Sequence, residues 1–264
     1  GGGGGAAGGG RGGGGGWSTA LPPPPPPPPP PAPRHRYEVL SLLQLPERVW
    51  LLRHAETTAP HVFNGAESDV DISELGERQS AAVADWFTRH RPTAVVSSAM
   101  LRAVRTATPI AAACGVPHTT HSNLHERRIG SLAGMPFATQ SGPWHDTIAA
   151  WTAGNTAFTT EGAESFDELV ARLVPAWNEV CAAHPGGRVV VVAHGIVCKV
   201  LLVSLLEGKG MADWGVMGRS ANLSVSELVP VLNGRWKAEQ LLHLPEPVAA
   251  VNEYAVRNGV VSSA

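Results

Sequence analysis

Short apolar runs alternate with longer amphipathic stretches between residues 48 and 243 of the chain. The valine run at 189–192 is typical of a strand that is buried on both faces of a sheet. Two later runs, at 225–229 and 236–242, flank Asn233-Gly234 and predict a hairpin. Four predicted strands precede this hairpin, and the last of them contains the valine run. They are Arg48–Arg53, Ala94–Ser97, His118–Ser122 and Arg188–Ala193.

The amphipathic stretches carry apolar residues at intervals of three and four, which is the spacing of a helix with one buried face. Ser73 precedes the first stretch as a candidate N-cap, and Gly115 and Gly208 follow two others as stop signals. The pattern predicts helices at Glu74–His90, Leu101–Cys114, Phe166–His184 and Ile196–Glu207.

This alternation of strands and helices predicts one α/β domain, a three-layer α/β/α sandwich with a largely parallel central sheet. We place the domain at residues 47–247, followed by a C-terminal tail at 248–264. The segment from about 131 to 165 lies between the predicted strands and helices of the sheet, and we expect it to form a small cap.

Residues 1–46 have a different composition, since glycine fills most of the first 16 positions and Pro22–Pro31 is an unbroken proline run. Such a segment cannot bury a core, so we expect a low-complexity, disordered coil followed by a stiff polyproline II rod. A spacer is the plain interpretation, and a ligand for a proline-binding module is the alternative. It lacks the apolar stretch of a secretory signal peptide.

Charge and cysteine content narrow the classes of partner. The formal net charge of −2 gives no reason to expect a nucleic acid or an anionic membrane as partner. No apolar run approaches the roughly 18 to 20 residues that span a bilayer.

The three cysteines have no CxxC spacing and predict reduced thiols in a cytoplasmic protein. His194 and Cys198 lie four residues apart but lack further ligands, so we expect no metal and no cofactor.

Two predicted strands end in histidine. Arg53-His54 follows the first strand, and His194-Gly195 follows the valine strand and directly precedes a helix. Ligands of open α/β sheets bind beyond the carboxyl ends of the strands, so neighbouring strands would bring both imidazoles into one crevice. Gly195 would let the backbone approach a ligand there, and the free N–H groups of the helix suit an anion.

Two further segments supply charge for such an anion. The helix predicted after the strand at 94–97 carries Arg102 and Arg105 in its first turns, and Glu126 stands in a loop after the strand at 118–122. Guanidinium groups bind phosphate oxygens in a fork, and a carboxyl group can deliver a proton. Together with the two histidines, this set matches phosphoryl transfer through a covalent histidine intermediate.

The chain from about 48 to 243 resembles the histidine phosphatase superfamily, the phosphoglycerate-mutase-like proteins. Four motifs occur in the family's order, and together they are more specific than any one alone. They are Arg53-His54-Ala55 for the RHG motif, Ser98 to Ala107 for the SxLxRAxQTA helix, Glu126 with Gly130 and Gly134, and His194-Gly195 for the second HG.

The resemblance implies that His54 is the phosphorylated nucleophile, with Arg53, Arg102 and His194 around the phosphoryl oxygens. It implies that Glu126 protonates the leaving oxygen and then activates water. The chain departs from the family at three positions. Ala55 replaces a glycine, Arg105 replaces a glutamine, and Pro60 stands where the family has an asparagine, so that Asn64 binds substrate only if the loop has shifted register.

The leading functional hypothesis is hydrolysis of a phosphomonoester of a small metabolite. The alternatives are a phosphoglycerate-type phosphomutase and a non-catalytic phosphate-binding adaptor that docks through the proline run. A mutase must hold a doubly anionic intermediate, yet no Lys or Arg occurs from Ile129 to Ala171. This favours a phosphatase, and it leads us to expect a neutral leaving group.

Overall fold

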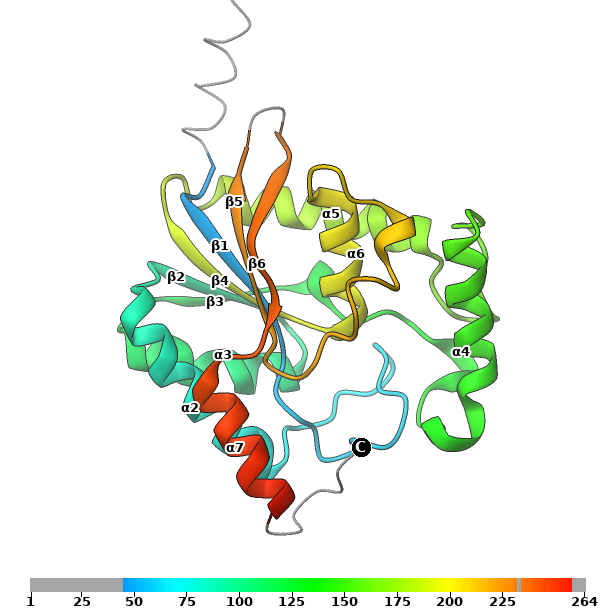
Figure 1. Cartoon of the computed structure of the whole chain (residues 1–264), viewed down its shortest axis with the longest axis horizontal. Coiled ribbons are helices and arrows are strands. Elements are labelled where there is room, and N and C mark those ends of the chain that lie inside the picture. The colour runs from blue at the N-terminus through cyan, green and yellow to red at the C-terminus, as the bar shows by residue number, and fades with distance from the viewer. Residues whose placement is uncertain (1–44, 232–233, 258–264) are drawn as a thin grey trace, which may run out of the picture.

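A computed structural model of the chain describes residues 45–231 and 234–257. Its centre is a six-stranded sheet with the strand order β3-β2-β4-β1-β5-β6 (Figure 1). The first four strands in this order run parallel, and β5 and β6 are antiparallel to their neighbours. The strands are β1 (Arg48–Arg53), β2 (Ala94–Ser98), β3 (His118–His121), β4 (Arg188–Ala193), β5 (Val225–Pro230) and β6 (Trp236–His243).

Helices cover both faces of the sheet and complete the three-layer sandwich (Figure 1). One apolar core lies between the sheet and the layer of α2, α3 and α7, and a second lies between the sheet and the layer of α5 and α6. The helix α4 stands at one side and belongs to the cap (Figure 1). The helices are α2 (Glu74–His90), α3 (Leu101–Cys114), α4 (Phe137–Thr152), α5 (Phe166–Ala182), α6 (Gly195–Leu205) and α7 (Glu246–Arg257).

Strand β4 shows why the valine run is continuous. Val189 and Val191 face the core under α5 and α6, whereas Val190 and Val192 face the core under α2 and α3. All four side chains are fully buried. Burying a valine side chain stabilises a fold by about 1.5–3 kcal/mol, and a polar residue at any of the four positions would lose this on one face.

Most predicted elements are confirmed to within two residues. The Ser73 hydroxyl accepts a hydrogen bond from the Gly76 N–H at 3.0 Å, as expected of the N-cap of α2. The predicted hairpin is the antiparallel pair β5 and β6, although residues 232–233 of its turn lie outside the described residues. The low-complexity segment and the proline run at Pro22–Pro31 also lie outside them, except for residues 45 and 46.

The sequence pattern did not predict α4 or α7. Helix α7 begins inside the predicted domain and continues into the segment that we assigned to a tail. It packs against α2 through the buried Val248, and the Asn252 side chain accepts a hydrogen bond from the Gln79 amide at 2.8 Å. Within the described residues, no helix is long and apolar enough to cross a bilayer.

Candidate active site

The parallel pairing of β1 and β4 brings the two strand-end histidines together. Arg53 lies opposite Ala193 in the register, so that His54 and His194 leave the sheet at the same edge. Their ring centroids are 5.2 Å apart, and the His54 N–H donates to the Ala193 carbonyl at 2.9 Å. The predicted meeting of the two imidazoles is confirmed.

The imidazole of His54 has a defined tautomer. Its Nδ1 lies 2.7 Å from the carbonyl oxygen of Ala55, and a carbonyl can only accept, so Nδ1 carries the proton. Burial lowers the pKa of His54 well below 6.5, and the positive charges of Arg53 and Arg102 lower it further. His54 is therefore a neutral imidazole at neutral pH, and the lone pair is on Nε2.

Backbone contacts fix the peptide groups on both sides of the His54 ring. The side-chain amide of Asn222, from the connection before β5, donates to the His54 carbonyl at 2.9 Å. The Ala55 N–H donates to the Thr106 hydroxyl on α3 at 3.0 Å. Ala55 has no positive φ, so the departure from the family's glycine causes no backbone strain. The sequence analysis assigned no role to Asn222 or Thr106.

His194 is fully buried, and neither of its ring nitrogens has a hydrogen-bond partner among the described residues. Burial lowers its pKa well below 6.5, and the charge of Arg102 adds to the effect. A buried polar group without a partner costs about 1–3 kcal/mol, so such groups are rare unless they serve a ligand. The ring of His194 is thus available for a ligand between the two strands.

The Nη atoms of Arg53 and Arg102 donate hydrogen bonds to main-chain carbonyls. Arg102 is fully buried on α3, and its Nη atoms donate to the carbonyls of Ser68 at 2.8 Å and Gly65 at 3.1 Å. Arg53 donates through Nη1 to the Ser220 carbonyl at 2.8 Å. In both side chains Nε is buried and has no partner among the described residues. Burial lowers the pKa of both guanidinium groups below the usual value of arginine.

Glu126 lies close to the amino end of α6. Its Oε1 accepts from the Arg127 N–H at 2.9 Å, and its Oε2 accepts from the Ile196 N–H at 3.4 Å. Ile196 belongs to the first turn of α6, where main-chain N–H groups have no partner within the helix. We expected these N–H groups to suit an anion, and in the structure one of them donates to the Glu126 carboxylate.

A buried ion pair holds the loop that carries Glu126. The Arg172 guanidinium on α5 binds both carboxylate oxygens of Glu164, at 2.7 and 3.0 Å, and also donates to the Glu126 carbonyl at 3.2 Å. Burial opposes ionisation of Glu164, but the hydrogen bonds from Arg172 and from the Arg128 N–H, together with the charge of Arg172, outweigh it and lower the pKa of Glu164. Sequence reasoning missed this pair because its members come from the cap and from a helix on the far side of the loop.

Arg127, next to Glu126, contacts residues of the cap and so joins the cap to the loop that carries Glu126. Only 1% of its surface is exposed, and its guanidinium lies 4.8 Å from the ring centroid of Trp151 and 5.5 Å from that of Trp144. Its Nε donates to the Glu164 carbonyl at 2.7 Å. Burial lowers the pKa of Arg127 to about 10, so the side chain stays positively charged at neutral pH.

Three further residues considered in the sequence analysis contact protein groups in the structure. The side-chain amide of Asn64 donates to the Ala59 carbonyl at 2.7 Å, which directs it into its own loop. Arg105 forms exposed ion pairs with Asp71 and Glu77 and points away from the histidines. Gly195 contacts the Arg53 side chain, since a Cβ there would lie 3.5 Å from the arginine Nε.

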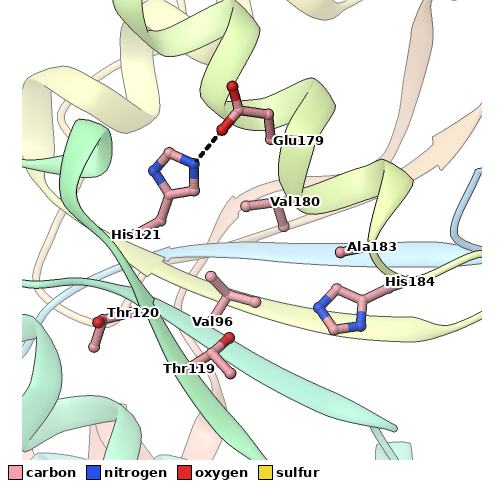
Figure 2. Close-up of a pocket in the computed structure, with 8 residues that line it drawn as sticks. All are labelled: Val96, Thr119, Thr120, His121, Glu179, Val180, Ala183 and His184. Atoms are coloured by element: carbon pink, nitrogen blue, oxygen red, sulfur yellow. Dashed lines mark hydrogen bonds and ion pairs between the residues drawn. The ribbon is translucent and has the colours of Figure 1, made fainter.

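A small pocket of about 120 Å³ lies apart from this site, between β3 and α5. Figure 2 shows its lining, in which His121 faces Glu179 at 2.9 Å and His184 lies just beyond the end of α5. Within the described part of the chain, no three His, Cys, Asp or Glu side chains are placed to hold a metal ion.

An α/β fold that gathers two imidazoles, two guanidinium groups and a carboxyl group at the carboxyl edge of its sheet defines a phosphoryl-transfer enzyme of the histidine type. The family model for the histidine phosphatase superfamily (branch 1) matches residues 49–241. The chain belongs to this superfamily.

Similar proteins are named phosphatases. The metal-independent phosphoserine phosphatase of Arabidopsis thaliana is 32% identical over 192 residues, which cover 70% of this chain and 77% of that protein. The glucosyl-3-phosphoglycerate phosphatase of Mycobacterium tuberculosis is 30% identical over 199 residues, which cover 72% and 86%. A structure of the mycobacterial glucosyl-3-phosphoglycerate phosphatase with VO3 has a TM-score of 0.65 and 28% identity, and the match covers 74% of this chain and 98% of that one.

Proposed function

We propose that this histidine phosphatase hydrolyses a phosphomonoester of a small metabolite through a phosphohistidine at His54. Nε2 of His54 attacks phosphorus, and the ester P–O bond breaks. The Glu126 carboxyl group gives its proton to the leaving oxygen. The resulting carboxylate then takes a proton from water, which attacks phosphorus, breaks the N–P bond and releases phosphate.

One observation carries this proposal: buried nitrogen atoms that have no hydrogen-bond partner in the described part of the chain lie around His54. They are both ring nitrogens of His194 and the Nε atoms of Arg53 and Arg102. All three side chains lie close enough to His54 to affect it, the arginines by lowering its pKa and His194 by ring contact. A phosphoryl group has three oxygens and would accept hydrogen bonds from the two Nε–H groups and from the one N–H that the neutral His194 ring carries, most strongly as its charge spreads in the transition state.

The names of the similar proteins support the same substrate class. Phosphoserine and glucosyl-3-phosphoglycerate are both small phosphorylated metabolites, and vanadate is bound by the mycobacterial relative. We assign Asn64 to the loop whose carbonyls hold Arg102 rather than to direct substrate contact. The three free cysteines fit a reducing cytoplasm, which is where we place the protein.

The mutase and the adaptor remain alternatives. A mutase would return the phosphoryl group to a bound hydroxy acid, whereas the similar proteins reported above are named phosphatases. An adaptor would need a site that binds phosphate without turnover, with the proline run as its docking segment. The neutral imidazole of His54, with a free lone pair on Nε2, favours an active nucleophile instead.

Phosphate release from a panel of phosphorylated metabolites and from p-nitrophenyl phosphate tests the proposal, with His54→Ala as the inactive control. We expect turnover by the parent without any added bisphosphorylated primer. Isomerisation of a phosphoglycerate at a higher rate than its hydrolysis would replace the phosphatase by the mutase. Binding of vanadate without any turnover would favour the adaptor.

A further inference from the structure

A second pocket, of about 260 Å³, adjoins the active site at the Arg53 side chain. It lies where the carboxyl end of β1 meets α2, α7 and the connection before β5. Its floor is joined to the nucleophile, because the Asn222 amide that lines it donates to the His54 carbonyl. The polar residues that line it are Arg53, Glu56, Gln79, Arg219, Asn222 and Asn252.

Two guanidinium groups face this pocket without a bound carboxylate. Arg219 is exposed and forms no hydrogen bond or ion pair with any residue that the structure describes. Burial lowers the pKa of Arg53, the charge of Glu126 opposes this, and the charge of Arg219 adds to the lowering. Like charges brought together are unfavourable, and an anion between them would relieve the repulsion.

The other polar groups of the pocket are already paired. Gln79 accepts from the Glu56 N–H at 2.9 Å and donates to Asn252 at 2.8 Å, which links α2 to α7. Glu56 carries the only carboxylate among the polar lining residues, and its Oε1 accepts from the Ser73 hydroxyl at 2.8 Å. With two cationic groups and one carboxylate, the lining keeps a net positive charge beside the phosphoryl site.

We propose that this pocket binds an anionic group, a carboxylate or a second phosphate, through Arg219 and Arg53. The inference rests on the proposed function and narrows its substrate class to phosphomonoesters whose leaving group is itself anionic. Arg53 lines the pocket, and its charge acts on His54. We therefore place the phosphoryl group of one small molecule at the histidine and its anionic group at Arg219. This replaces our expectation of a neutral leaving group, which considered only the cap.

A matched pair of substrates isolates the anionic group. O-Phosphoserine and O-phosphoethanolamine differ only by a carboxylate, so the ratio of their kcat/KM values measures what the carboxylate contributes. In Arg219→Gln we expect this ratio to fall about tenfold at constant ionic strength, with phosphoethanolamine changed less than about twofold. Arg89→Gln removes the same charge from an exposed position at the far end of α2, and should leave the ratio unchanged.

Malonate distinguishes a substrate group from a free anion. If a separate anion occupies the pocket, malonate will change phosphoethanolamine turnover in the parent but not in Arg219→Gln. The pocket would then be an anion site whose ligand is a free anion and not part of the substrate. An unchanged substrate ratio together with no malonate effect overturns the proposal. If neither these esters nor any other phosphomonoester of the panel is turned over, the proposed function fails by itself. Calorimetric titration of malonate then decides the pocket, since equal heats in parent and variant refute it.

Discussion

The imidazole rings of His54 and His194 lie 5.2 Å apart, one at the end of β1 and the other at the end of β4. Both are almost completely buried, and burial lowers the pKa of each well below 6.5. Two neutral imidazoles can approach this closely without electrostatic repulsion. Protonation of either one would place a third positive charge beside Arg53 and Arg102.

This pair makes the stability of the fold depend on pH. Below about 6.5 the unfolded chain binds protons at these histidines and the folded chain does not, so the free energy of unfolding falls as the pH falls. Each histidine should contribute a slope approaching about 1.4 kcal/mol per pH unit, down to its folded pKa. Urea denaturation between pH 7.5 and 5 measures this, and His194→Gln should be less acid-sensitive than the parent. Identical slopes in the two proteins would contradict the assignment.

The nucleophile can be tested by trapping. Rapid acid quench of the parent with a radiolabelled phosphomonoester should yield an acid-labile phosphoprotein, because an N–P bond is hydrolysed in acid. His54→Ala should lose turnover by at least about 10³-fold and still bind vanadate, since Arg53, Arg102 and His194 remain in place. A variant with activity within tenfold of the parent would remove His54 from this role.

The acid role of Glu126 depends on the leaving group. General acid catalysis contributes about 10²–10⁴-fold and matters most for poor leaving groups. Glu126→Gln should therefore slow phosphorylation by an alkyl phosphate by this factor, and slow phosphorylation by p-nitrophenyl phosphate far less. The phosphorylation step must be measured as a pre-steady-state burst, because loss of the base also slows water attack.

His125→Asn is the matched control for this substitution, since it changes the neighbouring side chain, whose Nδ1 contacts the Glu126 carbonyl at 2.7 Å. An equal loss of the burst rate with both esters in Glu126→Gln would remove Glu126 from the acid role. A leaving-group effect that appears in His125→Asn instead would move the role to the imidazole.

Arg102 and Arg105 lie one turn apart on α3 and allow a direct comparison. Arg102→Lys keeps the charge but loses the donors that hold the carbonyls of Ser68 and Gly65, so we expect destabilisation by about 2–4 kcal/mol. Vanadate should also bind about tenfold more weakly. Arg105→Gln removes only exposed ion pairs and should change the stability by less than about 1 kcal/mol. Similar losses from both substitutions would refute this distinction.

The sequence could predict the sheet and the site because both follow from strand ends. The continuous valines of β4 and the histidines after β1 and β4 give their burial, direction and shared edge without any tertiary information. The supporting contacts could not be predicted in the same way. Arg172 reaches Glu164 and Glu126 from another helix, and no local spacing records which main-chain carbonyl a long side chain will meet.

Helix α4 of the cap and the positive charge of Arg219 also could not be predicted from local sequence patterns. Helix α4 contains Gly142 and Pro143 and has no side-chain N-cap, so its sequence resembles a loop. Arg219 lies about 90 residues beyond Glu126 in the chain and reaches the active-site edge only through the connection before β5. A charge count over the cap alone could not include it.

The hydrogen bonds to the peptide groups on either side of His54 affect when the folding chain becomes active. Its N–H is held by Ala193 of β4, its carbonyl by Asn222 before β5, and the next N–H by Thr106 of α3. These three segments come from widely separated parts of the sequence and join only in the assembled sheet. During refolding, enzyme activity should consequently return last, after the far-ultraviolet circular dichroism and the tryptophan fluorescence have recovered. The rate at which activity returns would then report the rate at which β5 joins the sheet.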